Sequence, residues 1–222
     1  MGGKKAGLIL WTMFLVFVSV TCSLYAFSPG DLEIFKLTKS CPYCDLPGTN
    51  LSGLDLNKAR LTGANLAGAD FSNTNLIGAD LSNANLTGAK FINTKLTGAN
   101  LFRANMSNAR ISGVNLAGAD LTAADLSYAN VSNTNMINAD LSSAVIIGTK
   151  MSNVDLTTGK LSYANMTGAK LFDVNLSNTT MNLINLTDAN LTGVKFLRAD
   201  LSDATWTDGT KCVRGSIEQC KR

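Results

Sequence analysis

The cysteines are the residues of this chain best suited to chemistry. The 222-residue sequence contains no histidine, which excludes His-based catalytic triads, imidazole metal ligands and imidazole acid–base catalysis. Cys41 and Cys44 form a C-x-x-C motif, and Cys212 and Cys220 lie near the other end of the sequence. A thiolate in a C-x-x-C motif can be activated for disulfide exchange, and paired cysteines in an oxidising compartment can also form structural disulfides.

The tetrapeptide Cys41-Pro42-Tyr43-Cys44 resembles the active-site motif of glutaredoxins. Such a redox motif should follow a strand and open a helix inside a βαβ unit. Here the motif runs directly into a five-residue repeat, and Cys44 falls in the register of that repeat as a small inward-facing residue. We therefore interpret the motif as a structural clip, and a thiol–disulfide redox protein that uses Cys41 and Cys44 is the alternative.

Residues 1–27 have the composition of an export or anchoring segment. Lys4 and Lys5 precede an uncharged stretch, and its most strongly apolar part runs from Leu8 to Phe27. A run of this length can span a bilayer, while a small residue such as Ala26 near its end is typical of a secretory signal. The sequence predicts either a cleaved signal peptide or an uncleaved transmembrane anchor with its lysines inside.

Two other interpretations of the N-terminal segment remain. Cys22 suggests a lipidation site, although the residues before it fit one poorly, and a buried soluble helix would also need apolar residues. Either main interpretation predicts an exported protein, periplasmic or otherwise extracytoplasmic, or membrane-anchored with its repeats outside the cytoplasm. Of the 19 basic residues, removal of Lys4 and Lys5 leaves 17 against 16 acidic residues, so the exported part is nearly neutral.

A repeat of five residues runs without insertion from Leu51 to Leu201. Of the 31 positions at this spacing, 20 are Leu, and the others are Met, Phe, Ile or Val. The residue two positions earlier is small and most often Ala, and an Asn or Asp usually separates the two. Ser or Thr follows the large residue, and Gly or Asn often ends the unit.

This repeat predicts an all-β solenoid. Large and small residues two positions apart lie on the same side of an extended chain, and the polar residue between them faces out. An α-helix is excluded, because a five-residue period at 100° per residue would carry the large residues around the whole helix. Gly and Asn tolerate a positive φ, so each unit is expected to end in a turn. A chain that repeatedly extends and turns can bury a continuous Leu column only by coiling around it.

Units such as Ala64-Asn65-Leu66-Ala67-Gly68 resemble the pentapeptide-repeat family over residues 51–205. The resemblance implies a right-handed quadrilateral β-helix with four repeat units in each coil. About eight coils would then form a rod roughly 37 Å long at an inter-strand spacing of about 4.8 Å. The predicted organisation is an N-terminal hydrophobic helix in residues 1–27, a cap with the C-x-x-C motif in residues 28–50, the β-helix, and a C-terminal cap with a disulfide loop in residues 206–222.

Both ends of a solenoid need covering, because open coil edges invite further pairing. We expect a short helix over residues 28–39 to cover the first coil and Trp206 to cover the last one. The rod length implied by the resemblance separates Cys41 and Cys44 from Cys212 and Cys220, and disulfide-linked Cα atoms lie within about 7 Å of each other. The predicted disulfides therefore join the two cysteines at each end. The same separation excludes a four-cysteine zinc site in a monomer, and we expect no metal or cofactor.

With four repeat units in each coil, the outward residues of neighbouring coils stack into columns, and one column is unusually basic. It consists of Asp70, Lys90, Arg110, Asn130, Lys150, Lys170 and Asn190. The other outward columns at the equivalent position are mainly Asn and Asp. We predict that Lys90, Arg110, Lys150 and Lys170 form a possible face for an anionic partner. The alternative is a solvated face on which basic residues interrupt a repetitive surface.

The sequence favours a non-enzymatic, exported or membrane-tethered rod that acts as a structural or protein-interaction scaffold. It contains no paired carboxylates set apart from the repeat, no phosphate-binding loop and no metal-ligand cluster. The expected partner is an unknown protein or an anionic envelope component, and an uncleaved segment 1–27 would add the membrane. Some quinolone-resistance members of the pentapeptide-repeat family mimic duplex DNA, but this needs an acidic, cytoplasmic rod. The balanced charge and the export segment argue against it, and no nucleic-acid partner is expected.

Overall fold

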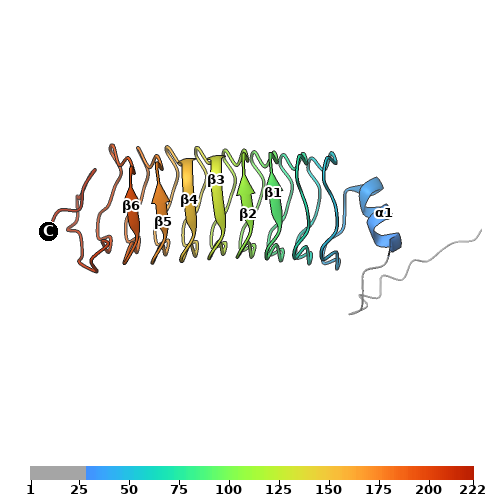
Figure 1. Cartoon of the computed structure of the whole chain (residues 1–222), viewed down its shortest axis with the longest axis horizontal. Helices are drawn as coiled ribbons and strands as arrows, with labels where there is room; N and C mark the ends of the chain where they lie inside the picture. The colour runs from blue at the N-terminus through green and yellow to red at the C-terminus, as the bar shows by residue number, and fades with distance from the viewer. Residues whose placement is uncertain (1–28) are drawn as a thin grey trace, which may run out of the picture.

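The protein forms a straight rod in which each coil of the chain lies beside the next (Figure 1). A computed structural model describes residues 29–222, and the predicted signal peptide or anchor in residues 1–27 lies outside the described residues. Within the described part of the chain, no helix is long and apolar enough to cross a membrane. The rod is a parallel β-solenoid, as the repeat predicts.

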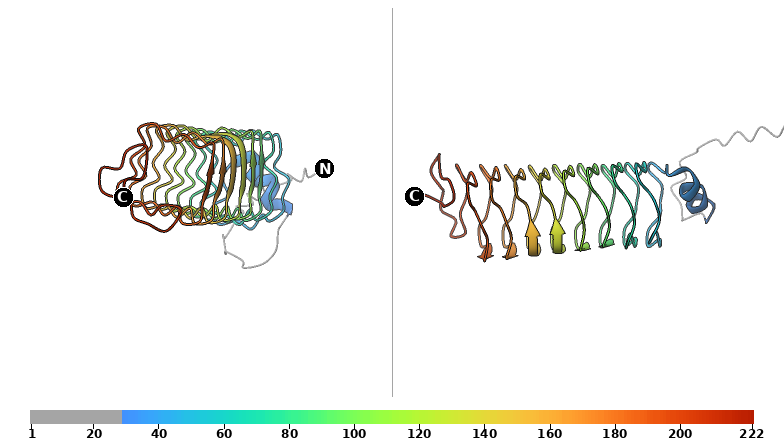
Figure 2. Two further views of the ribbon diagram at one scale, coloured as in Figure 1. Left: turned by 60° about the vertical axis from the view of Figure 1, so that its left-hand side comes forward. Right: turned by 90° about the horizontal axis from the view of Figure 1, so that it is seen from above.

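Four ladders of parallel bridges run along the rod, one on each side of the coil. Every parallel bridge joins residues 20 positions apart, so one coil contains four units of the repeat. The ladder that starts at Ser40 reaches Asp200 in eight such steps, which agrees with the predicted eight coils. The two views in Figure 2 show the coils stacked one after another along the rod.

The first coil begins earlier than we predicted. The first bridge joins Ser40 to Arg60, so residues 40–50 belong to the solenoid and only the residues before them form the N-terminal cap. Cys41 stands where the repeat normally has Leu, and Cys44 stands where it normally has Ala. Because the first unit lacks the large residue that marks the repeat, its sequence did not reveal it as a coil.

One side of the solenoid is regular enough to form a six-stranded parallel sheet. Its strands follow one another in chain order, from β1 to β6. They are β1 (Lys90–Ile92), β2 (Arg110–Ser112), β3 (Asn130–Asn135), β4 (Lys150–Asp155), β5 (Lys170–Phe172) and β6 (Asn190–Thr192). In each strand the central large residue points into the rod, and its two neighbours point outward.

A left-handed backbone conformation ends every repeat unit. Every fifth residue from Tyr43 to Asp203 has a positive φ, between 50° and 72°. Many of these positions are Gly or Asn, which adopt this conformation at little cost. Ala123 and Leu183 adopt it as well, because the bridges on both sides of each turn leave the backbone no alternative. The predicted turn at the end of each unit is confirmed.

The core contains the large and small apolar residues of the repeat. Leu121 in the middle of the rod has no exposed surface, and the same holds for most of the Leu and Ala positions. The rings of Phe71 and Phe91 stack in neighbouring coils, with centroids 5.0 Å apart and planes 4° from parallel. Where Thr replaces Ala, its hydroxyl finds a backbone acceptor: Thr74 donates to the carbonyl of Leu51 at 2.8 Å. The buried polar side chains of the described residues therefore all have hydrogen-bond partners.

The outward Asn and Asp residues hold the turns in shape. Their Oδ1 atoms accept a hydrogen bond from the backbone N–H two residues later, as Asp120 does from Thr122 at 2.9 Å. Some also bond along the ladder, and Asn85 Nδ2 donates to Asn65 Oδ1 at 3.0 Å. The abundance of Asn and Asp thus serves the backbone of the repeat.

The two ends of the solenoid are covered differently. At the N-terminal end lies the helix α1 (Pro29–Thr38), which buries Phe35 completely against the first coil. At the C-terminal end, residues 206–222 return across the last coil and pair with it in antiparallel fashion, with bridges from Thr205 to Lys211 and from Asp200 to Ile217. Trp206 packs against Phe196, with ring centroids 5.8 Å apart. Both predicted coverings are present, but the antiparallel pairing was not predicted.

Candidate functional site

The predicted basic residues lie together on the six-stranded sheet. Lys90, Arg110, Lys150 and Lys170 are the first residues of β1, β2, β4 and β5, and they occupy one register position. We refer to these four residues as the basic strip. Each of their backbone amides donates to a carbonyl of the preceding coil at 2.8 to 2.9 Å. The sheet therefore holds the four side chains at fixed spacing, one strand or two strands apart.

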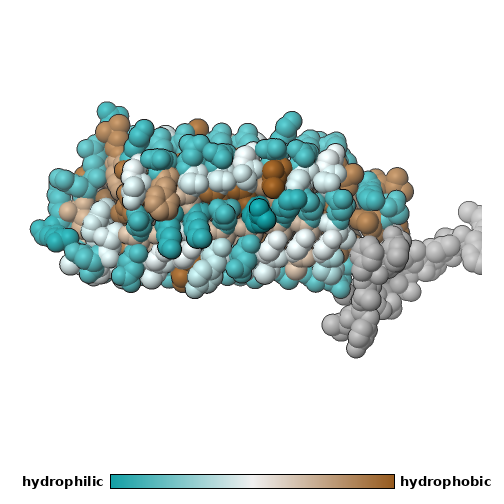
Figure 3. Space-filling view, in the orientation of Figure 1, coloured by the Kyte–Doolittle hydropathy of each residue, from teal (hydrophilic) through white to brown (hydrophobic). Residues whose placement is uncertain are grey.

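No carboxylate interrupts the basic strip. Asn130 separates the two pairs of cations, and Asn190 follows Lys170. Within the described part of the chain, Arg110, Lys150 and Lys170 form no salt bridge, and all three are exposed. Cations in adjacent strands lie about 4.8 Å apart in the backbone, so Arg110, Lys150 and Lys170 form an uncompensated positive part of the strip. Figure 3 shows hydrophilic residues in rows along the rod.

A carboxylate closes the basic strip only at its N-terminal end. Asp70 lies one coil before Lys90, and Lys90 Nζ approaches its Oδ2 at 2.9 Å. The hydroxyl of Ser72 also donates to Asp70, and its backbone amide donates at 2.9 Å. The Ser72 hydroxyl first, and then the ammonium of Lys90, lower the pKa of Asp70 to about 2. Lys90 is thus partly neutralised, unlike the other three cations.

Two exposed aromatic residues border the basic strip, and the sequence analysis did not assign them to it. Phe172 lies in β5 two residues after Lys170 and faces outward on the same side, with 40% of its surface exposed. Tyr128 lies at the turn before β3, and a Cβ atom on Gly148 would lie 2.7 Å from its ring. For Phe172 the sequence contains this signal, because residues two positions apart in a strand share a face, whereas Tyr128 lies in a turn with a left-handed backbone.

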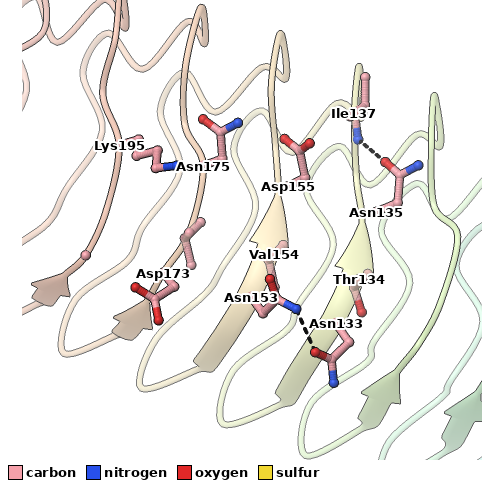
Figure 4. A pocket seen from close by; sticks show the side chains of 12 residues that line it. Asn133, Thr134, Asn135, Ile137, Asn153, Val154, Asp155, Asp173, Asn175 and Lys195 are labelled. Atoms are coloured by element: carbon pink, nitrogen blue, oxygen red, sulfur yellow. Dashed lines mark hydrogen bonds between the residues drawn. The ribbon is translucent and has the colours of Figure 1, made fainter.

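A polar groove of about 680 Å³ lies around the corner from the basic strip, at the C-terminal ends of the same strands. Its residues come from four successive coils (Figure 4). Asn153 Nδ2 donates to Asn133 Oδ1 at 2.8 Å there, and Asp155, Asp173 and Lys195 add charges of both signs. Because this groove contains acidic groups, it sets the limit of the positive surface.

The cysteines lie where the sequence predicts, in two pairs at opposite ends of the rod. The Cα atoms of Cys41 and Cys44 are 5.4 Å apart, and those of Cys212 and Cys220 are 5.0 Å apart, as disulfides require. The motif at Cys41 follows the C-terminal end of α1, and the chain after Cys44 continues into the first coil of the solenoid. There the backbone carbonyl of Cys44 accepts a hydrogen bond from the backbone amide of Asn65. Thus Cys41 lacks the helix N-terminus that activates a redox thiolate.

The family-specific sequence pattern agrees with this architecture. The family described as Pentapeptide repeats matches the chain in eight copies that together span residues 43–205. The chain belongs to the pentapeptide-repeat family. Proteins of this family are generally non-enzymatic structural or interaction proteins, and the fold described here is that of a structural or interaction scaffold. Within residues 29–222, no group of His, Cys, Asp and Glu is arranged to hold a metal ion.

Solved structures of pentapeptide-repeat proteins resemble this rod. HetL, a protein involved in heterocyst differentiation regulation in Nostoc sp. strain PCC 7120, is 25% identical, with a TM-score of 0.44 and coverage of 84% of this chain and 100% of HetL. The fluoroquinolone resistance protein QnrB1 is 20% identical, with a TM-score of 0.50 and coverage of 68% and 88%. A thylakoid-lumen pentapeptide-repeat protein of Arabidopsis thaliana is 23% identical, with a TM-score of 0.26 and coverage of 61% and 68%.

These comparisons define the fold rather than the partner. At 20% identity, the similarity to QnrB1 concerns the solenoid alone. No curated protein matches the chain in sequence. The function of this pentapeptide-repeat protein is therefore sought on its own surface, where the basic strip is a feature that the repeat does not require.

Proposed function

We propose that this pentapeptide-repeat protein is an exported, non-enzymatic rod that binds an acidic partner along the basic strip. The observation that supports the proposal is the row of four cations at one register position, interrupted only by the uncharged Asn130, with no carboxylate between Lys90 and Lys170. The repeat itself requires only a polar residue at this position, and in the other three columns Asn or Asp fills it in most coils, with basic residues only at Arg60, Lys95, Lys160 and Lys195. The cations are therefore an addition to the needs of the fold.

The cost of the arrangement supports a role in binding. Lys150 and Lys170 are partners in adjacent parallel strands, so two like charges lie side by side in the folded protein. Like charges directly opposite each other in a sheet destabilise it. A bound polyanion would remove this repulsion, and the fixed backbone of the sheet would lower the entropy cost of binding.

The shape of the basic strip favours an extended acidic segment of a protein. The cations lie in a straight line with a repeat of about 4.8 Å or its multiples, and a flat sheet offers no deep cleft for a compact ligand. Phe172 adds an exposed apolar ring beside the charges, which suits a peptide with acidic and apolar residues. A rod that displays such a strip is a scaffold, and we assign it no reaction.

Charge reversal on the strip tests this proposal. The probe is poly-L-glutamate, and the variants are the double substitution K150E and K170E and, as a control of equal charge change, K58E and K221E. Lys58 and Lys221 are exposed and lie outside the sheet. We expect the strip variant to weaken binding by about tenfold or more, which is about 1.4 kcal/mol, with a smaller effect in the control. Equal loss in both variants would show that net charge alone drives binding and would refute the strip as the site.

The compartment is the second part of the proposal. It is supported by the apolar sequence of residues 8–27 and by the cysteine pairs at the two ends, which we propose to be disulfides. Intact mass after cell fractionation, with and without thiol alkylation, tests both. A full-length membrane species with four protected end cysteines indicates a tethered rod, and a shortened soluble species indicates a released one. Cytoplasmic protein with free Cys41 and Cys44 contradicts export.

A further inference from the structure

The helix α1 is apolar on two opposite faces, but the rod covers only one of them. Phe35 is completely buried against the first coil, and Leu32 packs against the core beside it. On the other side, Ile34 is 58% exposed and Leu37 is 85% exposed. Leu37 has the largest exposed fraction of the large apolar side chains in the described part of the chain.

Helix geometry makes the two exposed residues one patch. At 100° per residue, Ile34 and Leu37 lie on one face, while Leu32 and Phe35 lie about 160° away on the opposite face. A helix that only closed the end of the rod would need a single apolar face. We call Ile34 and Leu37 the outer patch of α1.

The position of α1 fixes the direction in which the outer patch points. The helix lies across the N-terminal end of the solenoid (Figure 1). Because its Phe35 face packs onto the first coil, the opposite face points away from the rod along its long axis. The space-filling view shows hydrophobic atoms at this end of the molecule (Figure 3).

The sequence before α1 indicates what covers the outer patch. Only Ser28 separates α1 from the apolar run of residues 8–27, which is long enough to span a bilayer. We propose that the outer patch of α1 lies against the lipid surface, so that the rod stands on the membrane with its axis pointing away from it. This inference rests on the tethered form of the proposed exported rod, in which residues 1–27 are kept as an anchor, and adds to it a second, interfacial contact and an orientation.

A small patch suffices for this contact because the anchor supplies most of the affinity for the membrane. Two exposed apolar side chains would bind a bilayer weakly on their own, but a covalent anchor one residue away makes their insertion intramolecular. Glu33 and Lys36 on the flank of α1 compensate each other, since Lys36 Nζ pairs with Glu33 at 2.8 Å. Apolar residues on one side of a short helix, with paired charges beside them, suit the headgroup boundary.

The orientation also separates the basic strip from the membrane that holds the rod. Counted in coils from Ser40, Lys90 lies about 12 Å and Lys170 about 31 Å from the first coil along the rod, at about 4.8 Å per coil. Most of the strip is then out of reach of the headgroups of its own bilayer. This agrees with an acidic protein segment as the partner of the strip.

Photocrosslinking from the full-length chain tests the inference. The protein is reconstituted in vesicles of three parts phosphatidylcholine and one part phosphatidylglycerol, with benzoylphenylalanine in place of Leu37. The matched control carries the same group in place of Leu197, which is 57% exposed in the last full coil, at the far end of the rod. Vesicle flotation reports anchoring, and the mass of each crosslinked product reports what the group touched.

We expect lipid adducts from the probe at position 37 and none from the probe at position 197. The additional substitution I34S should reduce the lipid adducts formed at position 37. A floating protein without lipid adducts at position 37 overturns this inference but leaves the anchor intact. Adducts to a second copy, or to residues 1–27 of the same chain, overturn it as well. Protein that does not float refutes the anchor itself, so the two failures are distinguishable.

Discussion

Lys90 donates to Asp70 across two neighbouring coils, with Nζ and Oδ2 2.9 Å apart, and this pair is where an acid meets the basic strip. The two residues are bridge partners in the same ladder, 20 positions apart in the sequence. The other cations of the strip have uncharged or basic ladder partners: Asn130 follows Arg110, and Lys170 follows Lys150. Within the basic strip, Lys90 is therefore partly neutralised by Asp70, whereas Arg110, Lys150 and Lys170 have no acidic partner among the described residues.

The Asp70 pair predicts a loss of stability at acid pH. The pKa of Asp70 falls from 3.8 to about 2 in the folded protein, so its contribution is complete above pH 3.8 and is lost as the pH falls towards 2. Both side chains are a third or more exposed, so we expect a contribution of only about 0.5–1 kcal/mol at pH 5. Denaturant unfolding of D70N at pH 5 and pH 2.5 checks this, because the variant should lose less stability than the wild type between the two values.

A double-mutant cycle with K90Q separates the two causes of the lowered pKa. The Ser72 hydroxyl ranks before Lys90, so K90Q alone should leave part of the pH dependence in place. Identical pH dependence in the wild type and D70N would show that other carboxylates account for acid unfolding. Asp80 and Asp140 would then be the candidates: burial works to raise the pKa of each, but Ser hydroxyl and backbone N–H donors outweigh it and lower the pKa.

The Leu column predicts a large cost for a cavity in the middle of the rod. Leu121 has no exposed surface, so L121A should lower the free energy of unfolding by about 2–5 kcal/mol. The same substitution at the exposed Leu197 should change it by no more than about 0.5 kcal/mol. Urea or guanidinium titrations measure both. Similar values for the two variants would contradict the inward assignment of the repeat.

Two glycines with the same backbone conformation predict different outcomes. Gly118 and Gly148 have φ values of 66° and 63°, but a Cβ atom on Gly118 would meet nothing within 4 Å. On Gly148 it would lie 2.7 Å from the ring of Tyr128. We expect G118A to cost about 1–2 kcal/mol for the left-handed backbone alone, and G148A to cost more. The additional cost of G148A over G118A should disappear in the background Y128A. Thermal unfolding of the wild type, G118A, G148A, Y128A and the double variant G148A/Y128A tests this.

The regular part of the molecule was predictable because each unit repeats the same physical problem. The spacing of Leu121 and its equivalents requires an extended side and a turn, and the four-unit coil implied by the family resemblance then placed Lys150 beside Lys170. Phe71 and Phe91 stack for the same reason. In such a rod, the residues that contact each other in neighbouring coils are those 20 positions apart in the sequence.

The ends were less predictable because they do not repeat. Cys41 occupies a Leu position, so the start of the solenoid was placed too late, and the antiparallel pairing of Thr205 with Lys211 depends on tertiary contacts that no periodicity records. The outer patch of α1 also escaped detection. In the sequence Leu32, Ile34, Phe35 and Leu37 form one apolar cluster, and only the packing of α1 shows which of them remain exposed.

The last prediction concerns the stability cost of the basic strip. Lys170 lies beside Lys150 without a carboxylate partner, so K170Q should raise the free energy of unfolding by about 0.2–1 kcal/mol at low salt. The gain should vanish near 1 M salt, where the screening length is about 3 Å. K160Q is the control, because Lys160 pairs with Asp140 at 3.2 Å and its loss should lower stability slightly. Chemical denaturation of K170Q and K160Q at both salt concentrations measures the four changes in stability.

If K170Q stabilises the protein while weakening its binding to poly-L-glutamate, the strip has been kept at the expense of the fold, which is expected of a binding surface. A destabilised K170Q at low salt would instead mean that Lys170 serves the sheet, and the case for a binding role would lose its energetic support.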